Sequence, residues 1–347
     1  MSGHVSHSRR PRKVWLRILL GILICLAVFI LTIVIVVNIM LNKIGRPDPN
    51  ETYLTPEELT ELDKTNLREA IDDAPEPNVV YPELDESQIQ WSTPNQAIQT
   101  SQDIVNILLI GQDRRAGETR ARSDSMILVT FNKTQKAIIL TSFLRDLYVQ
   151  IPGYENNRLN AAYAFGGMEL LDDTLEENFG IQIDANLEVD FSGFSSIIDV
   201  LGGVDITLTP TEADYLGLPE GLNHMDGDTA LEYSRIRYLD SDFGRTNRQR
   251  KILTALYNSA KNMGLADFFS LTDQLFPLLT TDMSNLKIIS MITELFPMLS
   301  SSHLETLCIP AEGTYSFHTV NGMSVIVADF DANQNILAET LAPSTEN

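Results

Sequence analysis

Residues 105–111, VNILLIG, form a short apolar run that ends in glycine, which is typical of a buried β-strand. SMILVTF (125–131) and KAIILTSF (136–143) have the same character, and later apolar runs of strand length are ANLEVDF, VDITLTP, LETLCIP and MSVIVADF. Between them lie stretches with helical spacing, such as MELLDDTLEENFG, SGFSSIIDVLGG and FGRTNRQRKILTALYNSAKNMG. This alternation predicts an α/β fold, a mixed central sheet covered by helices on both faces.

A single N-terminal transmembrane helix is expected before this fold. Residues 18–41 are 24 residues without a charge, and at about 1.5 Å each they exceed the ~30 Å hydrocarbon core. Five basic residues precede the run: Arg9, Arg10, Arg12, Lys13 and Arg17. This basic flank predicts a cytoplasmic N-terminus and an extracytoplasmic remainder. A cleaved signal peptide is the alternative, but its apolar region would be shorter.

The charge of the chain excludes some partners. Its 347 residues have a net charge of −22, and because five of the 25 basic residues precede the span, the outward-facing part carries 20 basic and 47 acidic residues. Such a surface repels nucleic acid, which binds to basic surfaces. The two cysteines, Cys25 and Cys308, lie too far apart in this layout to predict a disulfide.

These observations divide the chain into five parts. A basic cytoplasmic tail (1–17) and the membrane span (18–41) precede a Pro-rich, acidic stalk (42–102), the α/β domain (103–335) and a short tail (336–347). Within the stalk, Thr55-Pro56-Glu57-Glu58 has the pattern of a helix N-terminus. The rest of the stalk reads as an extended spacer.

The first candidate site lies in GQDRRAGETRARSDS, residues 111–125. Asp113 follows the first predicted strand and Asp124 opens the next, with four arginines between them, Arg122 included. Functional residues of α/β domains gather at strand ends, and Mg²⁺ takes one or two carboxylates together with phosphate oxygens. A solvated turn with salt bridges is the alternative.

Arg145 is the second candidate, because it directly follows a strongly apolar strand and needs a partner there. That partner could be Asp146 in a structural ion pair, or a bound anion.

The third candidate is RIRYLDSDFGRTNRQRK, residues 235–251. If residues 234–238 are extended, Arg235 and Arg237 project from one face. Arg245 and Gln249 are four apart and share a helix face near its N-terminus, where an anion is favoured. The remaining cations, Arg248, Arg250 and Lys251, fit a solvated helix face.

Together the three segments suit a metal-bridged pyrophosphate. No G-x-x-x-x-G-K-[ST], H-E-x-x-H or G-x-S-x-G pattern occurs, so a P-loop, a zincin site and a nucleophile elbow have no support.

In order and spacing, NILLIGQDRR, ARSDSMILVTF, FLRDLYVQIPG, RLNAAYAFGG, VDFSGFSSIIDVLGGVDI and ALEYSRIRYLDSDFGRTNRQRKIL resemble the LytR-CpsA-Psr family over roughly residues 103–263. The resemblance implies an extracytoplasmic, Mg²⁺-using phosphotransferase of Gram-positive cell walls. Such enzymes transfer wall teichoic acid or capsular polysaccharide from an undecaprenyl-pyrophosphate carrier to the 6-hydroxyl of N-acetylmuramic acid in peptidoglycan.

The resemblance also assigns roles to individual residues. Asp113 and Asp124 correspond to the metal-site aspartates, and Asp242 to an acid that could act as base toward the acceptor hydroxyl. The pyrophosphate-binding set would be Arg122, Arg145, Arg158, Arg235, Arg237, Arg245 and Gln249, with Arg145 and Arg245 also catalytic. Arg158 stands where the family often has Lys.

Three other functions stay open. A pyrophosphatase would use the same metal and arginines with water as acceptor. A non-catalytic regulatory or wall-binding module is the second alternative, and in that case Arg145→Ala should leave the attachment of wall polymer intact. A glycosidase is disfavoured, because nearby arginines oppose the protonated carboxyl that it requires.

Overall fold

The structure is a computed structural model that describes residues 32, 35–61, 81–94, 103–112, 123–236, 239 and 242–341; of Asp242 and Leu265 only the backbone is described. The chain divides into two compact units, Met1–Lys43 and Ile44–Asn347. In the first, residues 35–41 are helical. No helix of the described part is long and apolar enough to cross a membrane. Most of the predicted span, residues 18–41, lies outside the described residues.

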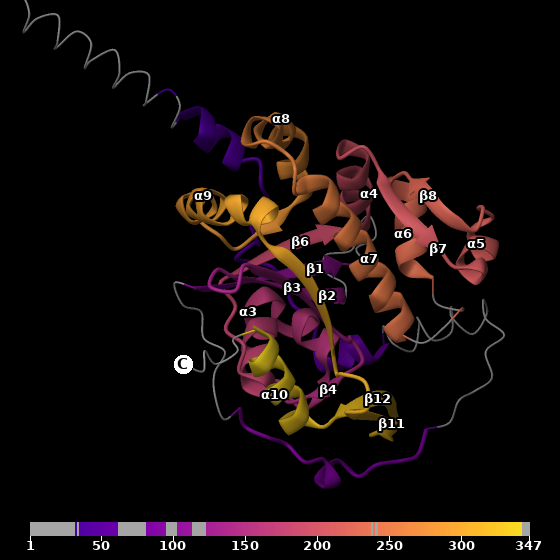
Figure 1. The fold of residues 1–347 in the computed structure, drawn as a ribbon. Coiled ribbons are helices and arrows are strands. Elements are labelled where there is room, and N and C mark those ends of the chain that lie inside the picture. Colours follow the sequence, from indigo (N-terminus) through magenta and orange to yellow (C-terminus); the bar gives the residue numbers. More distant parts are fainter. Residues whose placement is uncertain are drawn as a thin grey trace, which may run out of the picture. The chain divides into compact units, whose positions relative to one another are not determined.

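The second unit is built on a six-stranded mixed sheet, as predicted (Figure 1). Its strand order is β10-β3-β2-β1-β6-β9. The strands are β1 (Ile104–Gln112), β2 (Ser123–Asn132), β3 (Ala137–Phe143), β6 (Ala185–Asp190), β9 (Thr280–Thr281) and β10 (His303–Ile309). β2 pairs antiparallel with β1 and β3, whereas β6 is parallel to β1 and β10 is parallel to β3.

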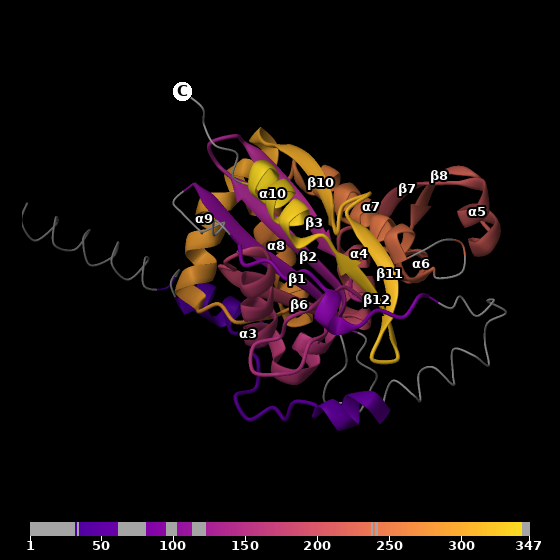
Figure 2. The same ribbon diagram turned by 90° about the horizontal axis from the view of Figure 1, so that it is seen from below.

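Helices cover both faces of this sheet (Figures 1 and 2). Alternate residues of β1 explain why: Leu108 and Ile110 belong to one core cluster, with α3 (Leu159–Phe179) and α10 (Phe330–Leu341), while Ile107 belongs to a second, with α9 (Asn285–Ser301). The second face is completed by α7 (Asp242–Ala260), which contributes Tyr257. The predicted α-β-α layering is therefore confirmed in the described residues.

α3 begins at Leu159, ahead of the helical stretch MELLDDTLEENFG that the sequence predicts. The helix bends at Gly167, whose φ of 65° is a backbone conformation that favours glycine. It ends at Gly180, which also has a positive φ. α8 (Leu265–Leu275) and the 3-10 turn η2 (Phe276–Leu278) lead into β9.

A separate lobe carries its own small core, formed around Val204, Ile206 and Tyr233. Its elements are α4 (Phe191–Val200), β7 (Val204–Leu208), α5 (Pro210–Leu216), β8 (Gly221–Met225) and α6 (Gly227–Arg235). Two small hairpins complete the fold: β4 (Tyr148–Val149) with β5 (Asn157–Arg158), and β11 (Tyr315–Val320) with β12 (Met323–Ala328).

The described parts of the expected stalk pack on the domain rather than standing off as a spacer. Leu59 and Ile89 lie in the main core cluster, and Trp91 packs against Tyr148 and Phe330 with ring centroids 6.1 and 5.3 Å apart. The helix predicted from Thr55 is present over residues 56–61, and Thr55 and Glu58 form the expected reciprocal cap. At the other end, α10 runs through position 335 to Leu341, which is buried.

Candidate active site

One edge of the sheet gathers most of the predicted site residues that the structure describes. Since β1, β3 and β6 run in the same direction, their carboxyl ends meet at this edge, and β2 begins there. Asp124 lies at the start of β2 and Arg145 lies two residues beyond β3. The expectation that these side chains meet at strand ends is confirmed for this pair.

Arg145 and Asp124 form a direct ion pair. The Arg145 Nη1 donates to Asp124 Oδ1 at 2.6 Å, and its Nε lies 3.5 Å from Asp146 Oδ2. Both partners of the 2.6 Å pair are partly buried. Asp146, the partner weighed from the sequence, is thus the more distant of the two carboxylates.

Arg158 extends this cluster at the N-terminus of α3. Its Nε donates to the Ser324 carbonyl at 3.1 Å and lies 3.7 Å from Asp146 Oδ1, so Asp146 sits between two guanidinium groups. The backbone N–H of Asn160 in the first turn donates to the Arg145 carbonyl at 3.2 Å. The Leu159 N–H likewise donates to the Leu147 carbonyl, so the first two N–H groups of α3 are already bonded, and Arg145 and Arg158 supply the positive charge that favours an anion here.

Arg235 lies at the end of β6, which is separated from β2 by β1. It is the last residue of α6, and its guanidinium lies 4.4 Å from the centroid of the Phe191 ring, a cation–π contact. Phe191 directly follows β6. The expectation that residues 234–238 are extended is wrong for Arg235, because α6 continues through it.

The first turns of α7 carry Arg245 and Gln249. Arg245 is only 4% exposed, and Gln249 is partly buried. Nearby, Phe243 stacks on Tyr315 of β11 with ring centroids 4.6 Å apart. β11 pairs with β12, whose Ile326 N–H donates to the Asp146 carbonyl. Phe243 of α7 and Asp146 therefore contact the same hairpin, β11–β12.

Arg248 was expected on a solvated helix face, and this expectation is wrong because the side chain is buried. It is 1% exposed, its Nη2 donates to the Ile236 carbonyl at 2.7 Å, and its Nη1 lies 3.6 Å from Glu212 Oε1. Arg248 therefore ties α7 to α5 and to the end of α6. The sequence offered no signal for this, since Glu212 is 36 positions away and caps its own helix.

Some predicted residues lie outside the described part of the chain: Asp113, Arg122 and Arg237. Asp242 begins α7, without a described side chain. In the described part, no group of three or more Asp, Glu, His or Cys is placed to hold a metal. Asp124 by itself offers a partly buried carboxylate beside Arg145 at the carboxyl ends of β1 and β3. Its chemistry fits a Mg²⁺ that completes its shell with phosphate oxygens.

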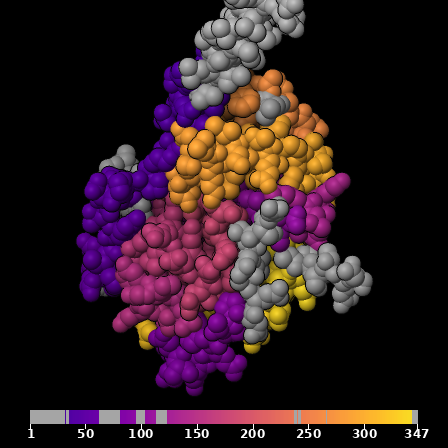
Figure 3. All heavy atoms as spheres, turned by 90° about the vertical axis from the view of Figure 1, so that its left-hand side faces the viewer, coloured from indigo at the N-terminus to yellow at the C-terminus, as the bar shows by residue number. Residues whose placement is uncertain are grey.

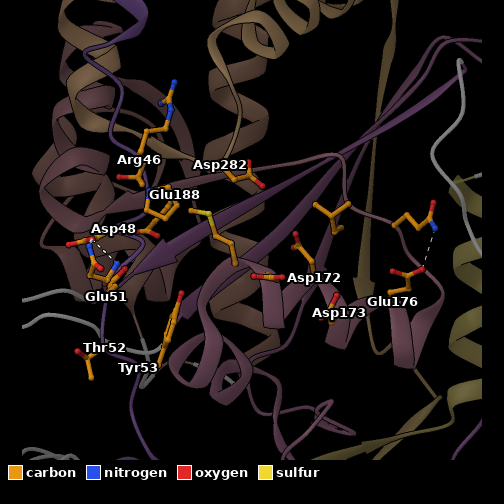
Figure 4. A pocket seen from close by; sticks show the side chains of 17 residues that line it. Arg46, Asp48, Glu51, Thr52, Tyr53, Asp172, Asp173, Glu176, Glu188 and Asp282 are labelled. Carbon is orange, nitrogen blue, oxygen red and sulfur yellow. Dashed lines mark hydrogen bonds between the residues drawn. The ribbon is translucent and has the colours of Figure 1, made fainter.

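Sequence reasoning missed an acidic pocket of about 920 Å³ beside α3 (Figure 4). Residues 46–53 form part of its wall, and carboxylates dominate the lining, among them Asp172, Glu188 and Asp282. Burial, aided by the charges of Asp282, Asp173 and Glu169, raises the pKa of Asp172 to about 7, although Asn186 donates to it at 2.8 Å. Tyr163 donates to Glu188 in the same wall. The sequence did contain a signal for this pocket, because four acids of α3 are spaced to lie on one side of the helix: Glu169, Asp172, Asp173 and Glu176.

The fold and the site define an α/β protein with partly buried arginines and carboxylates at its strand ends, beside the first turn of α3. The chain belongs to the LytR-CpsA-Psr family, because residues 79–341 match the sequence model of that family. The resemblance read from the sequence is thereby confirmed.

Relatives within the family carry different names. The chain is 35% identical over 218 residues to the Bacillus cereus polyisoprenyl-teichoic acid–peptidoglycan teichoic acid transferase TagU, covering 60% of this chain and 69% of the relative. It is 36% identical over 163 residues to the Staphylococcus aureus regulatory protein MsrR, covering 46% of this chain and 50% of the relative. A structure of TagT with bound octaprenyl pyrophosphate lipid superposes with a TM-score of 0.55 at 26% identity, over 72% of this chain and 96% of TagT.

Proposed function

We propose that this protein is a membrane-anchored, extracytoplasmic phosphotransferase. It moves an anionic glycopolymer, wall teichoic acid or capsular polysaccharide, from an undecaprenyl-pyrophosphate carrier to the 6-hydroxyl of N-acetylmuramic acid in peptidoglycan. The observation that carries the proposal is the Arg145–Asp124 pair beside Arg158 at the N-terminus of α3. The names of TagU and of lipid-bound TagT support the donor and the acceptor.

The reaction forms one P–O bond and breaks another. The acceptor hydroxyl attacks the phosphorus that carries the glycopolymer, its proton passes to a base, and the bond to the lipid phosphate breaks. Undecaprenyl phosphate leaves. Negative charge on the transferred phosphoryl group and the leaving phosphate is the main obstacle, so fixed positive charge is the main source of catalysis.

Arginine side chains and a bound Mg²⁺ would together supply that positive charge. Arg145, Arg158 and Arg235 hold the pyrophosphate in this proposal, assisted by the predicted Arg122, Arg237, Arg245 and Gln249. Arg145 is positioned by Asp124 and Asp146 before a substrate arrives. Mg²⁺, held by Asp124 and the predicted Asp113, would shield the phosphate charge. Asp242 is the candidate base.

Residues 18–41 are the proposed membrane anchor. The 24 uncharged residues preceded by five basic ones carry this part of the proposal. The acidic domain would then lie outside the cell, next to its polymer acceptor, with no nucleic-acid partner.

The test is a transfer reaction with the purified full chain, Mg²⁺ and a radiolabelled lipid-linked glycopolymer. With peptidoglycan present, we expect label to become covalently attached to the wall material and undecaprenyl phosphate to be released. Release of lipid phosphate with no attachment, whether or not peptidoglycan is added, would instead show a pyrophosphatase. An unchanged donor would favour the regulatory role that the name MsrR suggests.

A further inference from the structure

α8 and α9 expose an unusual set of large apolar side chains. Leu286 is 80% exposed, Phe269 40% and Ile289 36%. Leu286, Ile289 and Phe296 follow one another at helical spacing on α9. Phe296 contacts Phe268 of α8 at 5.5 Å between ring centroids, and Phe268 contacts Phe269 at 5.9 Å. We call these five residues the α8–α9 face; the two helices form one orange surface in Figure 3.

This face lies where the chain enters the domain. The Gly45 N–H donates to the Leu279 carbonyl at 2.8 Å, and the Gly45 carbonyl accepts from Thr281 at 3.1 Å. Arg46 Nη2 donates to Asn285 Oδ1 at 2.8 Å, and Asn285 is the first residue of α9, next to Leu286. Residues 45 and 46 are thus fixed beside the first turn of α9.

The predicted anchor ends only four residues earlier. Four extended residues span at most about 14 Å, so Gly45 must lie within roughly that distance of residue 41. If residues 18–41 cross a bilayer, the first turn of α9 is therefore held at its surface by the covalent chain.

We propose that the α8–α9 face rests on the outer surface of the lipid bilayer and inserts Leu286 and Ile289 among the headgroups. The inference rests on the proposed anchor. It adds a second attachment that fixes the tilt of the domain, and so the height of the strand-end site above the membrane.

Charge supports this orientation. The outward-facing part carries 47 acidic and 20 basic residues, so an anionic lipid surface repels most of the domain. Beside Leu286 lie two cations: Arg46, on Asn285, and Lys287, which donates to the Asp184 carbonyl. Long cationic side chains next to apolar ones are suited to the interface between headgroups and acyl chains. Asp267, the acid in the first turn of α8, accepts from the Gly264 N–H.

The experiment uses the full chain in vesicles of phosphatidylglycerol and phosphatidylethanolamine. With Cys25 and Cys308 replaced by serine, Leu286→Cys is labelled with an environment-sensitive fluorophore. Leu222→Cys is the matched control, because Leu222 is 72% exposed and lies on β8 in the separate lobe. We expect the probe at 286 to be quenched by brominated lipid and protected from aqueous iodide, and the probe at 222 to show the reverse.

Flotation of the vesicles after a carbonate wash tests the anchor independently. If the protein floats but the probe at 286 is quenched by iodide as strongly as the probe at 222, the proposed contact is wrong and the anchor stands. If the protein does not float, the anchor itself is wrong, and this inference is overturned with it.

Discussion

At the scale of single residues, Arg145 is the best-defined part of the candidate site. Two carboxylates hold its guanidinium at the sheet edge, at 2.6 and 3.5 Å. Such positioning is what charge stabilisation during phosphoryl transfer requires, because no reorganisation is then needed at the moment of reaction.

Arg145→Ala is therefore expected to lower the rate of polymer transfer about 10²–10³-fold. Arg145→Lys should recover only part of that rate, because an ammonium lacks the planar fork that grips phosphate. Lys133→Ala is the control: Lys133 pairs with Glu294 at the opposite end of the strands. Initial rates are compared on variants with unchanged circular dichroism. Full activity in Arg145→Ala would exclude a role in the reaction.

Asp172 makes a second prediction at this scale, on stability rather than catalysis. Its folded pKa of about 7 means that the folded protein keeps a proton that the unfolded chain loses near pH 4. The contribution of Asp172 to the free energy of unfolding therefore falls as the pH rises from about 4 to 7.

Asp172→Asn removes that pH dependence. Relative to wild type, the variant should gain stability across this range, by on the order of a few kcal/mol at pH 7.5. Urea unfolding at pH 4.5, 6 and 7.5 measures the difference, with Asp214→Asn, a change at an exposed carboxylate on α5, as the control. A difference that stays constant with pH would contradict the raised pKa.

At the scale of elements, the lobe is attached to the sheet domain through Arg248. This buried guanidinium joins α7 to Glu212 of α5 and to the carbonyl that follows α6. Since α6 ends at Arg235, the same contact helps to position Arg235, which is one of the predicted pyrophosphate-binding residues.

Arg248→Met is expected to lower the free energy of unfolding by about 3 kcal/mol, because Glu212 stays buried without its main cation. Combining it with Glu212→Gln should cost less than the sum of the two single changes. Urea denaturation of the three variants provides the test, and Lys133→Met should change the stability by less than about 1 kcal/mol. Strict additivity would show that the two side chains do not interact.

The elements also show what the sequence could and could not predict. The strands of the central sheet were predictable because long apolar runs such as 105–111 and 136–143 are buried on both faces. β8 and β11 were missed because polar residues interrupt their apolar pattern: Asn223 and His224 in β8, and Ser316, His318 and Thr319 in β11. At the site, motif order identified Asp124 and Arg145, but the distances that select Asp124 over Asp146 depend on strand register.

At the scale of the whole molecule, residues 44–61 and 81–94, which precede the first strand, contribute side chains to the core of the domain. Trp91 covers the core between Tyr148 and Phe330, far from it in sequence. The sequence suggested a spacer there because the segment is rich in proline and acid, and composition does not reveal a docking surface on the domain.

Trp91→Ala is expected to destabilise the domain by on the order of 2–4 kcal/mol, through the loss of buried aromatic surface. Tyr53→Ala, a change at an exposed ring in the same N-terminal segment, should have little effect. Thermal unfolding followed by near-ultraviolet circular dichroism compares them. Equal melting temperatures for Trp91→Ala and wild type would mean that residues 81–94 are a mere linker.

The central claim is that arginine and a divalent cation jointly bind a lipid pyrophosphate. The most direct measurement is a calorimetric titration of the purified full chain with octaprenyl pyrophosphate, in Mg²⁺ and in EDTA, alongside Arg145→Ala. We predict binding by the wild type in Mg²⁺ and affinity at least about tenfold weaker in EDTA and in the variant. The same affinity under all three conditions, or no binding by the wild type, would contradict the account.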